Sequence, residues 1–123
     1  MSTKYKFADN TAVYFTTSTV TGWSDVFTRQ LYKTILLNSI CHCQQKQGLV
    51  IHAWVLMTNH LHTICSCKEG QDLGLIWRNI KSFTATQITN AVLNNSQESR
   101  KQNLQHIFES AGKVSSSNTK HKF

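Results

Sequence analysis

Two histidines separated by one leucine, His60 and His62, have the types and spacing most suited to chemistry in this sequence. An apolar run rich in β-branched and aromatic residues precedes them at 50–56, and the residues Met57, Thr58 and Asn59 separate this run from the histidines. This pattern predicts a β-hairpin within residues 49–67. Because side chains alternate along a strand, the two imidazoles should share one face, about 7 Å apart. Neutral imidazole is the commonest metal ligand among side chains, so the pair could supply two ligands of a metal ion.

By spacing alone, two such histidines are more often a half-exposed strand pair that binds nothing than a pair of metal ligands. The surrounding segment IHAWVLMTNHLH, however, resembles the His-hydrophobe-His segment of single-tyrosine transposases of the REP-associated and insertion-sequence type. The resemblance implies that His60 and His62 hold a divalent metal, Mg²⁺ or Mn²⁺, which polarises a DNA phosphate. Asn59 would be the turn residue before them, and Thr58 stands where that family commonly has proline. The resemblance continues through YFTTSTVTGWSDVFTRQLYKTILL upstream and LGLIWRNIKSFTA downstream.

In the resembled family a tyrosine on a later helix attacks the phosphate and forms a covalent 5′-phosphotyrosine. The last strand and this catalytic helix follow the third helix, whereas the present sequence stops at Phe123, so we expect a C-terminally truncated copy. Its three tyrosines, Tyr5, Tyr14 and Tyr32, match no catalytic position. The resemblance therefore predicts a transposase-like DNA-binding protein that keeps the metal-binding histidines and is inactive in strand transfer by itself.

The charge balance points to the same kind of partner. The 123 residues carry a formal net charge of +7, and the excess is concentrated in residues 73–123. A basic surface binds phosphates in a salt-dependent way, which favours DNA, here single-stranded or hairpin DNA, although a basic surface can also serve solubility alone. The candidate phosphate contacts are Arg78, Lys81, Arg100 and Lys101. The sequence has no membrane-length apolar run and no secretory signal, so we expect no membrane partner and a cytoplasmic location.

Four cysteines form two Cys-x-Cys pairs, Cys41 with Cys43 and Cys65 with Cys67. Without an export signal, disulfides are not expected. The second pair shares a strand face, but residues two apart on a helix point roughly 200° from one another, so a four-cysteine zinc site would require a broken helix. The alternative to zinc binding is that these are small core residues.

Around the hairpin, the periodicity predicts one domain over residues 1–123, with an N-terminal arm (1–11), a core (12–112) and a basic flexible tail (113–123). A strand is expected over 12–20, a helix between Thr28 and Gly48, a second over 73–92 and a third over 97–111. The expected inward residues of the helices are Leu31, Ile35, Leu36, Ile40 and Cys43 in the first, Leu73, Ile76, Ile80, Phe83 and Ile88 in the second, and Leu104, Ile107, Phe108 and Ala111 in the third. The order β-α-β-β-α predicts an α+β, ferredoxin-like antiparallel sheet with helices on one face and its last strand missing.

Two further functions remain open at this point. The chain could be an inactive remnant or metal-free nucleic-acid-binding module, or a small zinc protein built on Cys65, Cys67 and the histidines. The strand over 12–20 contains no charge or proline to protect a free edge, which predicts a homodimer or association with a full-length relative.

Overall fold

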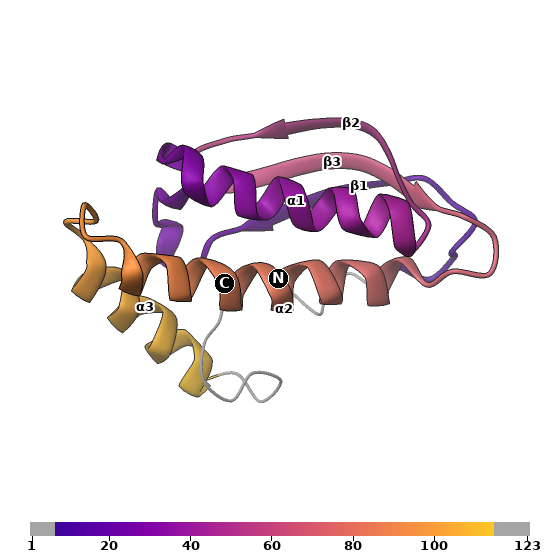
Figure 1. Ribbon diagram of the computed structural model, residues 1–123. Helices are drawn as coiled ribbons and strands as arrows, with labels where there is room; N and C mark the ends of the chain where they lie inside the picture. The colour runs from indigo at the N-terminus through magenta and orange to yellow at the C-terminus, as the bar shows by residue number, and fades with distance from the viewer. Residues whose placement is uncertain (1–6, 115–123) are drawn as a thin grey trace.

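The protein folds as a three-stranded antiparallel sheet with its two long helices on one side, as the computed structural model shows for residues 7–114 (Figure 1). In chain order the elements are β1 (Tyr14–Thr19), the 3-10 helices η1 (Thr21–Trp23) and η2 (Val26–Thr28), α1 (Gln30–Lys46), β2 (Leu49–Leu56), β3 (His60–Cys67), α2 (Leu73–Asn94) and α3 (Lys101–Val114). The strands lie in the order β1-β3-β2. The predicted α+β, ferredoxin-like β-α-β-β-α order is confirmed, and the predicted hairpin is β2 and β3.

The sheet has one face against the helices and one face toward solvent. On β3 the helix-facing side chains are buried: Leu61, Thr63 and Cys65. The alternate residues of β3 lie on the other side, which we call the open face: His60, His62, Ile64 and Ser66. On β1 the same alternation buries Thr16, whose hydroxyl lies 2.5 Å from that of Thr63, and leaves Phe15 and Thr17 on the open face. Strand alternation thus sorts the sequence into core and surface as expected.

The inward faces of α1 and α2 differ from the prediction at one residue each. Leu31 is half exposed and its neighbour Tyr32 is buried; Phe83 is likewise exposed and its neighbour Thr84 is buried. Successive helical residues lie about 100° apart, so the rotation of a helix about its axis decides which of two adjacent side chains enters the core. Gly48 does follow α1 with a positive φ of 77°, as its predicted role at the helix end requires.

The ends of the described chain also depart from expectation. Residues 7–11 were expected in a loose arm, but Phe7 packs edge-on against Tyr14 with ring centroids 4.9 Å apart, and the Asn10 side chain accepts a hydrogen bond from the Leu73 N–H. Helix α3 begins at Lys101, four residues later than predicted, and continues past Gly112 to Val114. The rest of the arm and of the predicted tail lie outside the described residues. No helix within residues 7–114 has the length and apolarity needed to cross a bilayer.

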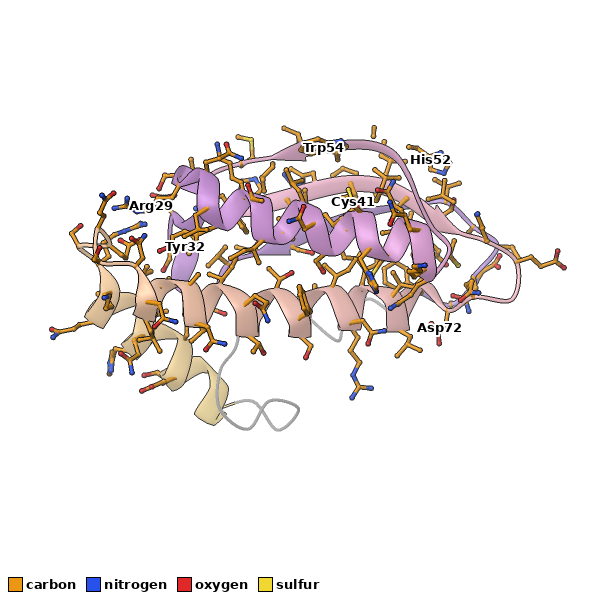
Figure 2. The ribbon with its side chains drawn as sticks, in the orientation of Figure 1. Arg29, Tyr32, Cys41, His52, Trp54 and Asp72 are labelled. Carbon is orange, nitrogen blue, oxygen red and sulfur yellow. The ribbon has the colours of Figure 1, made fainter. Side chains whose placement is uncertain are left out.

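A buried carboxylate joins the α2–α3 connection to the start of α1. Glu98, whose side chain is 0% exposed, binds Arg29 at 3.0 Å and Arg100 at 3.1 Å, and accepts a hydrogen bond from the Tyr32 hydroxyl. Figure 2 shows Arg29 and Tyr32 at the same end of α1, beside this connection. Burial by itself raises the pKa of Glu98, but hydrogen bonds from Arg100 and Tyr32 and the charge of Arg100 outweigh it and lower the pKa to about 2. The carboxylate is therefore ionised at neutral pH and fixes α3 against the core.

Candidate metal site on the open face

The two histidines of β3 lie side by side on the open face. Their ring centroids are 4.7 Å apart and the rings meet at 78°. Opposite them on β1 are Thr19, paired with His60, and Thr17, paired with His62. The prediction that both imidazoles share one sheet face is confirmed, and the regular β1–β3 pairing on one side and the hairpin on the other hold the pair on a rigid element.

Each imidazole has one ring nitrogen engaged within the chain. His60 Nδ1 lies 2.7 Å from Asn59 Oδ1, and His62 Nδ1 lies 2.9 Å from Thr17 Oγ1. An amide oxygen accepts hydrogen bonds, so it selects the tautomer in which Nδ1 carries the proton; the threonine hydroxyl can accept in the same way. Both Nε2 atoms then present lone pairs, which is the usual arrangement of metal-binding histidines and their supporting oxygens. The Nε2 atoms of His60 and His62 therefore fit the role of two ligands of a divalent metal ion.

The turn that precedes His60 is held by hydrogen bonds to the segment that directly follows β1. Thr58 Oγ1 donates to Asp25 Oδ1 at 2.8 Å, and the carbonyl of Thr58 accepts from the Phe27 N–H at the same distance. The next carbonyl, that of Asn59, accepts from the Val20 N–H at 2.8 Å. Thr58, at the position where proline is common in the resembled family, is thus held by hydrogen bonds to the segment 20–27.

Neither cysteine pair joins this site. Within residues 7–114, no three His, Cys, Asp or Glu side chains come together as a metal-binding group. Cys65 is fully buried on the helix-facing side of β3, opposite to the histidines, and burial raises the pKa of the Cys43 thiol in the core. A zinc site that combines Cys65 with His60 and His62 is incompatible with this alternation, so this alternative is wrong.

The profile of the family described as "Transposase IS200 like" matches residues 18–121. The chain belongs to this family of IS200-like transposases. The match spans the histidine pair, all of α1 and α2 and the described part of α3, and membership implies DNA as a partner. No curated protein and no solved structure matches the chain significantly.

For a member of a transposase family, the positions of the tyrosines matter. Tyr14 pairs with Cys65 on the helix-facing side of the sheet, and its hydroxyl donates to the Asp9 carbonyl at 2.9 Å. Tyr32 is 0% exposed and bound to Glu98, and desolvation raises its pKa, which makes its oxygen a weaker nucleophile at neutral pH. Tyr5 lies outside the described residues. Neither described tyrosine therefore faces the histidine pair.

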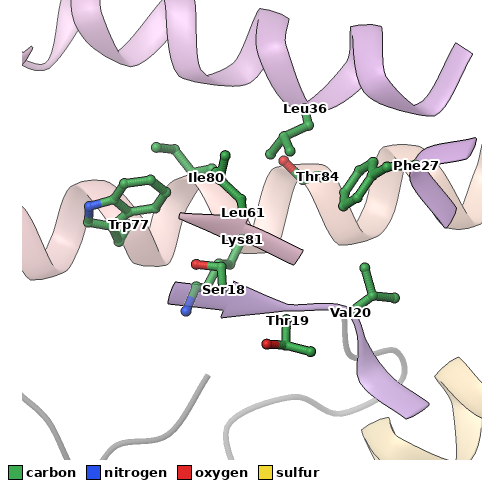
Figure 3. A pocket seen from close by; sticks show the side chains of 10 residues that line it. All are labelled: Ser18, Thr19, Val20, Phe27, Leu36, Leu61, Trp77, Ile80, Lys81 and Thr84. Carbon is green, nitrogen blue, oxygen red and sulfur yellow. The ribbon is translucent and has the colours of Figure 1, made fainter. Parts of the chain in front are cut away.

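The four basic residues chosen as DNA contacts do not gather at the histidines. Arg78 is exposed on α2 and Lys101 is partly exposed at the start of α3. Arg100 is engaged by Glu98 and donates to the Asp25 carbonyl at 3.1 Å, so it positions the fold. The Lys81 amine is buried and lines a cavity of about 30 Å³ between β1 and α2 with Ser18, Trp77 and Thr84 (Figure 3). All four come from α2, the α2–α3 connection or α3, on the side of the sheet opposite to the histidines (Figure 1).

The sequence analysis missed two residues that contact the histidine pair. Thr17 is the hydrogen-bond partner of His62 described above, and Phe15 stacks on His62 with ring centroids 5.4 Å apart and planes 21° apart. The alternation of β1 already placed these two residues on one face. It could not show that this face also carries the histidines, because that depends on the pairing of β1 with β3, in which Thr17 meets His62, 45 residues later in the chain.

Proposed function

We propose that this chain acts in DNA transposition by binding single-stranded or hairpin DNA on the open face, with one phosphate beside a Mg²⁺ or Mn²⁺ ion at His60 and His62. One observation carries the proposal: two neighbouring imidazoles whose Nδ1 atoms have oxygen partners, so that both Nε2 atoms are available on a solvent-facing sheet. A divalent ion held there would supply positive charge to stabilise negative charge on a phosphate oxygen.

The chain's own residues orient this site. Asn59 and Thr17 fix the tautomers of the two histidines, and the hydrogen bonds of Thr58 hold the turn from which His60 emerges. Since Tyr14 points to the other side of the sheet and Tyr32 is buried, neither supplies the nucleophile of strand transfer. The proposed contribution of residues 7–114 is thus to bind and position a DNA phosphate, without a covalent step of their own.

Metal binding tests the proposal directly. Titration of Mn²⁺, followed by the electron paramagnetic resonance of the free ion, should show binding in the presence of a single-stranded oligonucleotide. The double variant His60→Ala/His62→Ala should lose it. His106→Ala is the matched control, because His106 is exposed on α3, away from the sheet. Equal Mn²⁺ binding by the double variant and the parent protein would refute the assignment.

A metal-free DNA-binding module is the second candidate, and the exposure of Arg78 together with the net charge of +7 favours it. Such a module would bind DNA equally well in EDTA and in Mn²⁺, and Arg78→Ala would weaken it more than the histidine variants do. Both candidates predict DNA affinity that falls steeply as salt is raised, because phosphate contacts release counterions. The comparison of EDTA with Mn²⁺ therefore separates them.

A further inference from the structure

An exposed aromatic side chain lies directly beside the histidine pair. Phe15 on β1 is 68% exposed, although a phenyl ring of this size usually dominates a core or an interface. Its ring is close to parallel with that of His62, at 21° and 5.4 Å. Because His62 covers one side of the ring, the exposed area consists of the ring's edge and its opposite side.

The neighbours of Phe15 on the open face do not cover it. Its register partner on β3 is Ile64, which is itself 41% exposed, and Ala53, the partner of Ile64 on β2, is too small to shield the ring. On the other side β1 has no neighbouring strand within residues 7–114. The ring is therefore held by the strand and by His62, and it is free to receive a flat partner.

We propose that Phe15 is a stacking platform for a nucleobase of single-stranded DNA, next to the phosphate at His60 and His62. The inference rests on the proposed function and adds a contact by which the open face binds the bases of the DNA. Single-strand binding proteins combine contacts to the phosphates with aromatic rings on which bases stack, and such stacking tolerates any base because every base has a π face. The sheet holds the two side chains that would make these contacts, Phe15 and His62, with ring centroids 5.4 Å apart.

The test uses two short oligonucleotides of equal length and charge, one intact and one abasic at every position. Fluorescence anisotropy in Mn²⁺ should show about tenfold weaker binding of the abasic strand to the parent protein, as expected for losing one base–aromatic contact. Phe15→Leu should bind the intact strand about tenfold more weakly and should no longer distinguish the two strands. Phe15→Trp should restore the distinction, because tryptophan also offers a ring.

Phe83→Leu is the matched control, since Phe83 is 52% exposed on α2, in the helix layer. It should leave both affinities unchanged, and circular dichroism should show every variant folded, because the substituted side chains are exposed. If Phe15→Leu binds both strands like the parent protein, the platform is refuted. The proposed function survives that result if binding still requires Mn²⁺ and the two histidines. If Phe15→Leu abolishes self-association and leaves DNA affinity unchanged, the ring belongs to an interface between copies, which also refutes the platform. If the parent protein binds neither strand, the platform and the proposed function fail together.

Discussion

Glu98→Gln removes the negative charge from a buried carboxylate and leaves Arg29 and Arg100 without their counter-charge. A carboxyl group whose pKa is lower in the folded than in the unfolded state stabilises the fold above its unfolded pKa, and this stabilisation is lost as the pH falls toward the folded pKa. For Glu98 the pKa falls from 4.5 to about 2. At about 1.36 kcal/mol per pKa unit, the ionised carboxylate contributes about 3 kcal/mol at neutral pH.

The glutamine variant should therefore be less stable by about 3 kcal/mol at pH 7, with a melting temperature lower by about 10 °C or more. The loss of stability should stay below the upper range for broken buried ion pairs, because the side chains of Arg29 and Arg100 keep about a third of their surface in water. Below pH 4.5 the difference between the two proteins should shrink, and it should be small near pH 2, where the carboxyl of the parent protein takes up a proton.

Urea unfolding followed by circular dichroism at several pH values between 2 and 7 measures this difference. Glu69→Gln provides the control, because Glu69 is exposed in the turn between β3 and α2, and it should behave like the parent protein at every pH. Equal stability of the Glu98→Gln variant and the parent protein at pH 7 would refute the reasoning. A stability difference that stays constant from pH 6 to pH 3 would also refute it, since the loss would then come from packing and not from the ionised Glu98 carboxylate.

Three further expectations follow from the same structure. Thr84→Val should raise the free energy of unfolding by about 1 kcal/mol, because the Thr84 hydroxyl is buried without a hydrogen-bond partner. Thr63→Val removes the hydrogen bond to Thr16 and should lower the free energy of unfolding by a similar amount. Urea titrations that give both changes the same sign would contradict this. The chain alone should form no covalent adduct with single-stranded DNA in Mn²⁺ or Mg²⁺, and an adduct on a denaturing gel that maps to Tyr14 or Tyr32 would show their placement to be wrong. The uncharged edge of β1 should drive self-association, so its amides should exchange more slowly as the protein concentration rises; unchanged exchange in a strictly monomeric sample at high micromolar concentration would rule this out.

The histidine pair could be predicted from the sequence because it depends only on local geometry. A strand with a two-residue alternation leaves His60 and His62 on one side, whatever the strand pairs with. The element order β-α-β-β-α was equally accessible, since each segment has its own periodicity and its own turn residues. Both predictions rest on contacts between residues close together in the chain.

The surroundings of Arg100 and Lys81 could not be predicted, because they depend on how distant segments of the chain pack together. Arg100 carries the positive charge of a DNA contact, yet its guanidinium is bound to Glu98. The same buried carboxylate binds Arg29, which lies 69 residues earlier in the chain. Lys81 lies one helical turn from Trp77, and whether its amine reaches solvent or the space below β1 depends on how α2 rotates against the sheet. Charge and spacing carry no information about such pairings.

The brace on the turn before His60 has a consequence for how the protein acquires its site during folding. A proline ring would stiffen position 58 through covalent bonds, so the turn would be rigid as soon as it was synthesised. Here the stiffness comes from Thr58 and Asn59 bonding to Asp25, Phe27 and Val20, more than 30 residues earlier in the chain. The hairpin can form early, because its contacts are local, but its turn becomes fixed only when the segment 20–27 docks. The two imidazoles thus reach their final orientation late, and an isolated peptide spanning residues 49–67 would contain both histidines without holding them in place.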